Sequence, residues 1–214
     1  KEPDTDTAIL QLESGEMDIY AQPISDVDSI DDVETSTDLN SFPIYDFYSE
    51  LTFNPSGPIF NNGNLNPFAV PTVREAMNVL VDREHIKDNI YSGLGRARWL
   101  PIRSFGRDYI DTLETSHMLE IQYGYDFLAA QRVITAEMQD LGATLEGGLW
   151  YYGDEPVEII LLIRTEDERE QIGDYVADQL EALGFTVDRQ YVTGSEASPI
   201  WIQSDPADGE FHIY

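Results

Sequence analysis

The carboxylates between positions 26 and 34 are the side chains most suited to binding a metal ion. Calcium prefers several carboxylate oxygens, and this stretch supplies five acidic residues: Asp26, Asp28, Asp31, Asp32 and Glu34. The spacing of an EF-hand loop is broken, because Ile30 stands at the fifth position and no glycine follows it. The three histidines lie far apart and form no H-E-x-x-H zinc motif. We therefore predict a solvated acidic segment and no metal site.

The sequence has no recognisable catalytic motif. Residues 194–198, GSEAS, do not match the G-x-S-x-G nucleophile elbow. Gly93 and Gly95 follow a predicted helix, whereas a dinucleotide-binding loop would follow a strand. The chain has no cysteine, which excludes disulfides, thiolate zinc sites and a cysteine nucleophile. Its 41 acidic residues offer many carboxylate pairs for glycoside hydrolysis but single out none. We predict no catalytic residue and no cofactor.

Two groups of side chains could bind a solute or a partner. The first is a set of arginines, whose guanidinium groups could hold an anion: Arg96, Arg98, Arg103 and Arg107. For these we favour local charge balance against neighbouring acids. The second is a run of aromatic residues, which could stack on a ligand beside a cleft or pack in the core: Phe42, Tyr45, Phe47, Tyr48 and Phe53.

Composition limits the partners. The chain has 214 residues, of which 42% are hydrophobic, and carries 41 acidic against 12 basic residues, a formal charge of −29. Such a charge excludes a nucleic-acid binder and disfavours anionic membrane surfaces. No apolar run approaches the roughly 20 residues that would span a bilayer. An acidic, lysine-poor surface suits high-salt or exposed surroundings.

Capping signals mark the best-specified helices in the middle of the chain. Thr72 and Glu75 have the spacing of a capping box and come before an apolar face with helical periodicity. Asp82 can cap a second helix directly after the first. Asp126 can cap a third, which ends at Gly142.

The last third has the pattern of a β-α-β unit. Residues 157–163 form a continuous apolar run, which is typical of a strand covered on both faces. Thr165 and Glu168 have the spacing of a capping box for the helix that follows. Residues 185–191 return as a strand, which we expect to run parallel to the first. Residues 211–214 predict a third strand.

These elements predict an α/β fold, with a mixed, largely parallel sheet flanked by helices. A strand that is apolar on both faces needs a helical layer on each side. We expect the helices within 72–92 and 126–141 to cover the face opposite the last helix. Near the start of the chain we expect a strand at residues 17–20 and a loop or weak acidic helix at 25–41.

Several stretches, in family order, resemble the extracellular solute-binding proteins of peptide- and nickel-type ABC importers, family 5. The strongest is NPFAVPTVREAMNVLVDREHI at 66–86, a Pro-led helix followed by Asp-Arg before a second helix. LESGEMDI at 12–19 resembles the family's "sGeiDi", and DQLEALGFTV at 178–187 resembles "adqLkkiGi.v". GEFHIY at 209–214 resembles "gdfDi", with His212 in place of the aspartate.

The resemblance implies a lobe of the type II periplasmic-binding-protein fold. Because family members are longer, we expect residues 1–65 to enter from the first lobe and hinge, and residues 66–214 to form an incomplete α/β lobe. The implied role is non-enzymatic: the protein would bind peptides or similar small solutes and deliver them to a membrane permease. It would be extracellular or periplasmic, anchored through a lipid attachment outside this chain, and the main acidic ligand anchor would lie beyond residue 214.

We place the predicted ligand contacts next to the hinge strand, at Tyr45, Phe47, Tyr48 and Asn54, where aromatic faces and an amide could line the cleft. Two other functions remain open from the sequence. A secreted carbohydrate-active or metal-dependent hydrolase domain would need a deep pocket with two carboxylates. A cell-surface interaction domain would form a stable protein complex.

Overall fold

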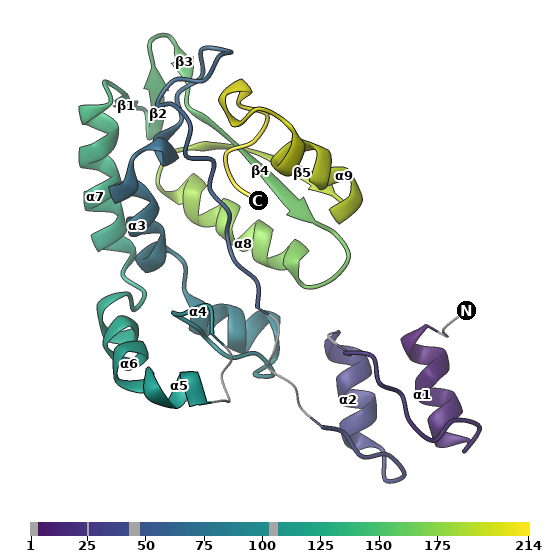
Figure 1. Cartoon of the computed structure of the whole chain (residues 1–214). Coiled ribbons are helices and arrows are strands. Elements are labelled where there is room, and N and C mark those ends of the chain that lie inside the picture. Colours follow the sequence, from purple (N-terminus) through teal and green to yellow (C-terminus); the bar gives the residue numbers. More distant parts are fainter. Residues whose placement is uncertain (1–3, 25, 43–47, 103–106) are drawn as a thin grey trace.

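The structure is a computed structural model, and it describes residues 4–24, 26–42, 48–102 and 107–214 (Figure 1). Its α-helices are α1 (Thr5–Glu13), α2 (Val27–Thr35), α3 (Pro71–Leu80), α4 (Arg83–His85), α5 (Arg107–Asp111), α6 (Leu113–Gln122), α7 (Phe127–Asp140), α8 (Arg169–Ala182) and α9 (Gly194–Ser198). Short 3-10 or π turns are η1 (Pro67–Ala69), η2 (Ile86–Ile90), η3 (Pro199–Gln203) and η4 (Pro206–Asp208). The strands are β1 (Thr144–Glu146), β2 (Leu149–Tyr152), β3 (Glu155–Pro156), β4 (Glu158–Arg164) and β5 (Thr186–Val192).

The main sheet is mixed and largely parallel, as predicted. β4 and β5 pair in parallel, from Glu158 opposite Thr186 to Arg164 opposite Val192. Residues 211–214 lie on the other side of β4 and run parallel to it. Residues 52–54 then add an antiparallel edge, through backbone hydrogen bonds between Thr52 and Tyr214. The α/β fold class is therefore confirmed.

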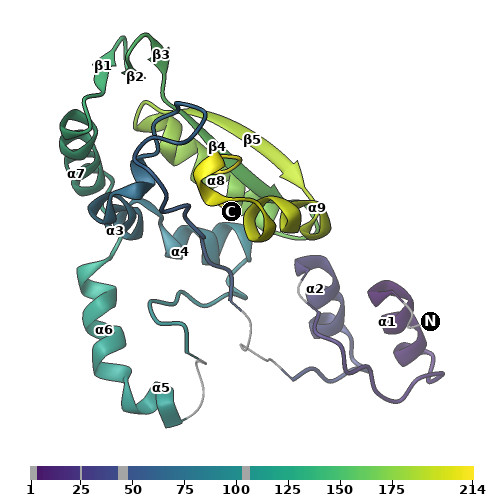
Figure 2. The same cartoon turned by 45° about the horizontal axis from the view of Figure 1, so that its top comes forward.

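One face of β4 forms the core of the lobe. Side chains alternate between the two faces of a strand, so Ile159, Leu161 and Ile163 point to the same side, and each is at most 1% exposed. A Cβ at Gly173 of α8 would lie 2.6 Å from Ile163, which places α8 against this face. The buried side chains of α3 and α7 belong to the same cluster, and these two helices lie side by side (Figures 1 and 2).

The expectation that α3 and α7 cover the opposite face of the sheet is wrong. Leu162 points to that face and is buried outside the main cluster. The short helix α9 contacts both β4 and β5. The second layer is therefore built from α9 and the segment after it. Periodicity identified α3 and α7 as amphipathic, but it cannot assign a helix to one face of a sheet.

A small antiparallel sheet, β1-β2-β3, closes the end of the lobe near α7. Gly147 and Gly148 form the first turn with positive φ angles of 59° and 90°, a conformation that glycine adopts without steric cost. Trp150 of β2 is 1% exposed, and its indole N–H donates to the carbonyl of Leu183 at 2.9 Å. The hairpin is thereby attached to the end of α8.

The predicted capping boxes at Thr72 and Thr165 do not form. α3 begins at Pro71 after Val70, and α8 begins after Glu168, in each case with no side-chain cap. Asp82 and Asp126 cap their helices as predicted. A capping box does form at Thr193 at the start of α9, where the sequence analysis had not placed a helix.

One of the two expectations for the first 42 residues is wrong: residues 17–20 form no strand, although they lie in the described part of the chain. Residues 27–35 form the helix α2, which is one of the two alternatives expected for residues 25–41. Asp26 caps it through the N–H of Ser29 at 2.8 Å. Farther on, α5 and α6 form a helix pair that the sequence analysis had not anticipated. Within the described residues, no helix is long and apolar enough to cross a membrane.

Candidate functional site

The parallel strands end at one common edge of the sheet. β4 ends at Arg164 and β5 at Val192, and residues 211–214 run parallel to β4 toward the same edge. In open α/β sheets, ligands bind outside the carboxyl ends of the strands. The helices α1 and α2 lie beyond this edge (Figures 1 and 2). The carboxyl edge is therefore the first place to look for a binding surface.

Arg164 organises the loops at this edge. Its Nε and one terminal nitrogen donate to both carboxylate oxygens of Glu166, at 2.6 and 2.9 Å, and the other nitrogen donates to the hydroxyl of Tyr214 at 3.0 Å. The hydrogen bond from Arg164 lowers the pKa of Glu166 to about 2. Glu166 also accepts from the N–H of Gly194 at 2.6 Å. A bidentate pair of this kind fixes geometry, so Arg164 and Glu166 hold the loop after β4 against the start of α9.

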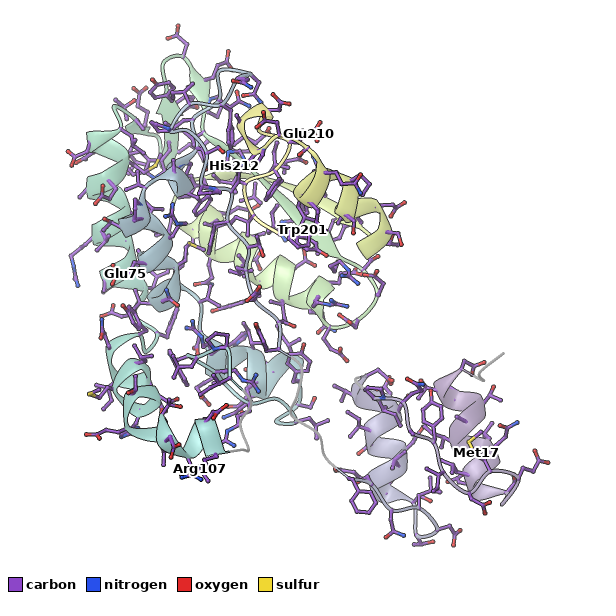
Figure 3. All side chains as sticks on the ribbon, viewed as in Figure 1. Met17, Glu75, Arg107, Trp201, Glu210 and His212 are labelled. Carbon is purple, nitrogen blue, oxygen red and sulfur yellow. The ribbon has the colours of Figure 1, made fainter. Side chains whose placement is uncertain are left out.

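An aromatic stack lies beside this ion pair. The ring of Trp201 (labelled in Figure 3) stacks on that of Tyr214, with centroids 4.8 Å apart and planes 26° apart. The indole nitrogen of Trp201 is buried and has no hydrogen-bond partner among the described residues. The stack packs the segment after α9 against residues 211–214.

Two of the four predicted ligand residues, Tyr45 and Phe47, lie outside the described residues. The other two have different surroundings. Tyr48 is 50% exposed, and the guanidinium of Arg98 lies 5.5 Å from its ring centroid. Asn54 is fully buried and donates to the backbone carbonyls of Pro206 and Phe211 at 2.8 and 3.0 Å. The Tyr48 ring is therefore accessible to a ligand. The Asn54 side chain is instead buried against the backbone of Pro206 and Phe211.

Tyr91 connects the entering segment to the carboxyl edge. Burial raises the pKa of its hydroxyl, the charges of Glu168 and Asp167 add to the rise, and a hydrogen bond with Ser49 opposes it. Tyr91 therefore lies between the start of the strand at 51–54 and the loop after β4. Its ring packs against the backbone of Gly95, where a Cβ would come within 3.3 Å.

The arginines of residues 83–107 lie mainly over aromatic rings. Arg83 lies 5.4 Å from the ring centroid of Trp99, and Arg96 lies 5.3 Å from that of Tyr109. Such cation–π contacts stabilise a charge without a carboxylate. Arg107 forms a 3.7 Å ion pair with Asp111, which fits the favoured charge balance for that residue. Arg103 lies outside the described residues.

A hollow of about 310 Å³ lies between the start of α2 and the carboxyl edge. Its lining residues are Asp26, Val27, Asp28, Asn89, Ile90, Ser92, Glu168 and Gln171. Ser92 adopts a left-handed conformation with φ 51°, which costs about 1–2 kcal/mol in a non-glycine residue. Glu168 is 8% exposed.

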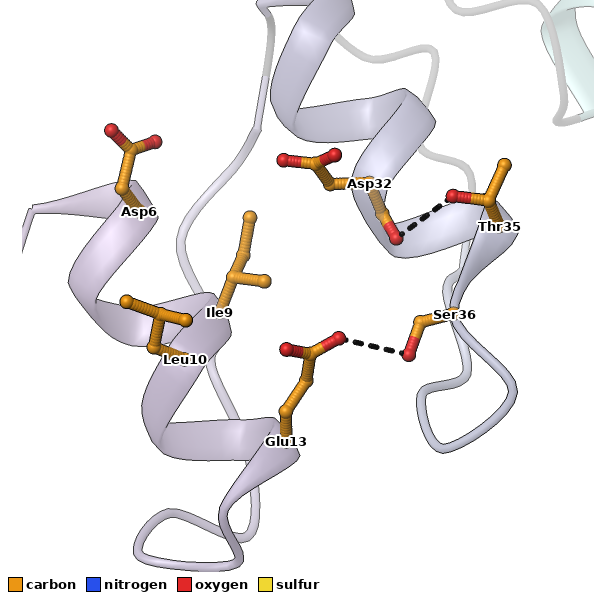
Figure 4. A pocket seen from close by; sticks show the side chains of 7 residues that line it. All are labelled: Asp6, Ile9, Leu10, Glu13, Asp32, Thr35 and Ser36. Atoms are coloured by element: carbon orange, nitrogen blue, oxygen red, sulfur yellow. Dashed lines mark hydrogen bonds between the residues drawn. The ribbon is translucent and has the colours of Figure 1, made fainter.

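A second hollow, of about 430 Å³, is the seam between α1 and α2 (Figure 4). Glu13 accepts from the hydroxyl of Ser36 at 3.1 Å across it, and Ile9 and Leu10 supply its apolar side. The acids of α2 do not converge: no group of three or more metal-binding side chains occurs among the described residues.

His212, in the last predicted strand, is fully buried. Its Nδ1 accepts from the N–H of Ile160 at 3.0 Å, so the proton is on Nε2, which lies 3.4 Å from the carbonyl of Leu65. Burial lowers the pKa of the imidazole to about 4. A neutral histidine therefore supplies the acceptor that ties residues 211–214 to β4.

The sequence analysis missed Arg164, Glu166, Glu168, Tyr91 and Trp201. Arg164 is the last residue of β4, and Glu166 and Glu168 lie in the loop after it. A position at the carboxyl end of a predicted parallel strand is a signal that sequence analysis could have used. Tyr91 and Trp201 reach the edge from separate helical segments. Sequence spacing gives no sign of that proximity.

The fold of this chain resembles one part of several larger solved proteins. The oligopeptide-binding protein AppA from Bacillus subtilis, in complex with a nonapeptide, is 20% identical with a TM-score of 0.58, over 91% of this chain and 36% of that one. Lactococcal OppA, complexed with an endogenous peptide in the closed conformation, is 16% identical with a TM-score of 0.66, over 98% and 39%. NikZ from Campylobacter jejuni, in complex with Ni(L-His), is 16% identical with a TM-score of 0.59, over 92% and 36%.

The sequence itself identifies the family. Among curated proteins, none matches this chain. The family profile described as bacterial extracellular solute-binding proteins, family 5 Middle, matches residues 2–214, almost the whole chain. The protein therefore belongs to the bacterial extracellular solute-binding proteins of family 5.

Proposed function

We propose that this chain is part of the substrate-binding component of an ABC importer, which binds peptides or similar small solutes and delivers them to a membrane permease. The observation that carries the proposal is the carboxyl edge of the sheet, where Trp201 stacks on Tyr214 and Tyr91 lies near the loop after β4. Tyr48 adds an exposed ring next to Ser49, the partner of Tyr91. Family membership supports a solute-binding role without catalysis. AppA and OppA, whose folds are similar, were solved with peptides.

The chain spans only 36–39% of these solved proteins, and the proposal extends to the longer protein. Residues 1–65 would lead in from the first lobe and hinge, and residues 66–214 would form part of the lobe that closes on the solute. The protein would act outside the cytoplasmic membrane, held there by a lipid anchor. The Tyr45, Phe47 and Tyr48 rings would line the cleft, and Asn54 would hold the strand that positions them.

Solute binding by this chain alone should be weak, because closure of two lobes supplies contacts that one lobe lacks. We expect short peptides at millimolar concentration to shift backbone amide resonances in a nuclear magnetic resonance titration. The shifts should cluster at residues 48–49, 91–98 and 211–214. Calorimetry that finds micromolar peptide affinity for residues 1–214 alone would contradict the proposal that the solute is bound between two lobes.

The matched variants for this test are Tyr48→Ala and Tyr152→Ala. Both remove a partly exposed tyrosine, with 50% and 36% exposure, but Tyr152 lies on β2, in the small sheet away from the carboxyl edge. We expect Tyr48→Ala to reduce the shifts and Tyr152→Ala to leave them unchanged. Equal effects, or shifts scattered over the whole lobe, would refute binding at this edge.

A further inference from the structure

We propose that the exposed apolar side of the helix pair α5–α6 is a docking surface for a partner protein, which presents an amphipathic helix bordered by lysine and arginine. We call this surface the α6 face. It consists of Ile110, Leu113, Met118 and Ile121, whose side chains are 70%, 53%, 56% and 73% exposed. The inference concerns a protein partner and does not depend on the proposed binding of a solute.

The geometry of a helix brings these side chains together. Leu113 and Ile121 are separated by about two turns of α6 and so lie on the same side of it, and Met118 is the neighbour of Ile121 one turn back. Ser116 and Leu119, on the other side of α6, are half-buried. The helix therefore turns that side toward the lobe and leaves the α6 face to solvent.

Nothing in the described part of the chain covers the α6 face. No residue of α6 is buried, and the helix is held to the lobe just beyond its end, where the hydroxyl of Tyr123 donates to Glu75 at 2.8 Å. Figures 1 and 2 show α5 and α6 below α7, away from β4 and β5, and Arg107 at the start of α5 is labelled in Figure 3. Single exposed apolar side chains are normal, but a concentrated group of large ones marks an interaction site.

The charges around the α6 face are mainly negative. Asp111, Glu114 and Glu120 lie on these two helices, and Glu114 is one turn from Met118 on the helix surface. Arg107 is the only lysine or arginine that the structure describes on α5 and α6, and it pairs with Asp111 at 3.7 Å. Lysine and arginine on an approaching surface would therefore be attracted, whereas carboxylates would be repelled.

The same charges argue against a second copy of this chain as the partner. In an antiparallel contact that places Leu113 of one copy opposite Ile121 of the other, Glu114 would face Glu120. In a parallel contact each acid would face itself. The formal charge of −29 adds a general repulsion between copies. A helix with an apolar stripe between lysines or arginines avoids these conflicts, and it can pack on α6 through interlocking rows of side chains.

The test is a nuclear magnetic resonance titration of residues 1–214 with three acetylated and amidated peptides. The first consists of leucine and lysine, with the leucines at helical spacing. The second has glutamate in place of each lysine, and the third has the residues of the first in an order that gives no apolar face. We expect the first peptide to shift the amides of residues 110–121 and to bind about tenfold more tightly than either of the others, because only it combines apolar contact with opposite charge.

Leu113→Ser and Ile121→Ser each remove part of the α6 face, and Leu10→Ser is the matched control. Leu10 is 65% exposed on α1, a helix that also has an acidic first turn. The two α6 variants should weaken binding of the first peptide at least about fivefold, the loss expected when an interface anchor is truncated. Leu10→Ser should leave it unchanged. Thermal unfolding of each variant shows whether the folded state is intact, and two positions are used so that one unstable variant does not decide the result.

Several results would overturn the inference. Equal binding of the first and third peptides would mean attraction by charge alone, and equal binding of the first and second would mean that the border charge plays no part. A loss of affinity at Leu10→Ser but not at Leu113→Ser would place the contact between α1 and α2. Self-association that Leu113→Ser abolishes would assign the α6 face to a second copy, and binding to phosphatidylcholine vesicles that it abolishes would assign the face to a membrane. In each case the proposed solute-binding function stands.

Discussion

His212 is a buried titratable residue on which the pairing of residues 211–214 with β4 depends. The imidazole Nδ1 accepts a hydrogen bond from the N–H of Ile160. This hydrogen bond requires the neutral form of the ring. A protonated imidazole has a donor on each nitrogen, so His212 would then oppose the N–H of Ile160.

We predict that His212 makes the lobe less stable in mild acid. Its pKa is about 4 in the folded chain and about 6.5 unfolded. Between these values the unfolded state binds the extra proton, so the free energy of unfolding falls as pH falls from about 6.5 to 4. The full difference amounts to about 3 kcal/mol. Urea unfolding curves across this pH range measure it.

His212→Asn is the control, because its side-chain oxygen can accept from Ile160 but does not titrate. Carboxylates elsewhere titrate in both proteins and cancel in the difference between the two curves. The wild-type curve should fall below that of the variant as the pH approaches 4. Parallel curves would show that His212 is not the titrating group.

At the scale of elements, the spacing of a capping box did not by itself predict where a helix begins. Thr72 and Glu75 have the spacing of a capping box, but Pro71 begins α3 one residue earlier, because its fixed φ suits the first helical position. At Thr193 the box is complete: its N–H donates to Glu196 at 2.8 Å, and its hydroxyl accepts from the N–H of Glu196 at 3.3 Å.

We predict that Thr193→Ala destabilises the lobe by about 1 kcal/mol, the usual cost of losing a cap. The loss should extend beyond α9, because α9 covers β4 and β5. Thr72→Ala should change the free energy of unfolding by less than about 0.5 kcal/mol, as exposed positions outside such features do. Urea unfolding of both variants compares them directly, and a larger effect at Thr72 would contradict the observed caps.

At the scale of the whole molecule, charge is the dominant feature. Forty-one acids against 12 bases leave a formal charge of −29, and the ion pairs of the lobe concentrate on a few arginines. Arg189 alone contacts Asp174, Asp178 and Glu181 at 2.6–3.0 Å. Most acids therefore repel one another across the surface, which destabilises a compact state.

We predict that monovalent salt stabilises the folded chain. The screening length falls from about 10 Å at 0.1 M to about 3 Å at 1 M, which weakens repulsion between surface carboxylates. The urea midpoint should rise steeply at low salt and level off. Sodium and potassium chloride should act alike at equal ionic strength. A midpoint that does not change, or that falls with added salt, would contradict this account.

The sequence by itself determined several of the secondary-structure elements of this protein. The apolar run at 157–163 and the periodic helix after it specified a parallel β-α-β unit, because alternation, burial and right-handed crossover constrain such a unit strongly. Asp82 and Asp126 fixed helix starts in the same local way. The strongest stretch of the family resemblance, residues 66–86, is likewise one continuous piece of sequence.

Only the tertiary structure decided the site. Tyr91 comes near Ser49 and Glu168, and Tyr214 meets Arg164 and Trp201, although these partners are distant in sequence. They meet because residues 52–54 pair with 212–214 and the latter run beside β4. The side of the sheet taken by α3 and α7 was likewise decided by packing. Local patterns report which face of an element is apolar, but the partner of that face depends on contacts between segments far apart in the chain.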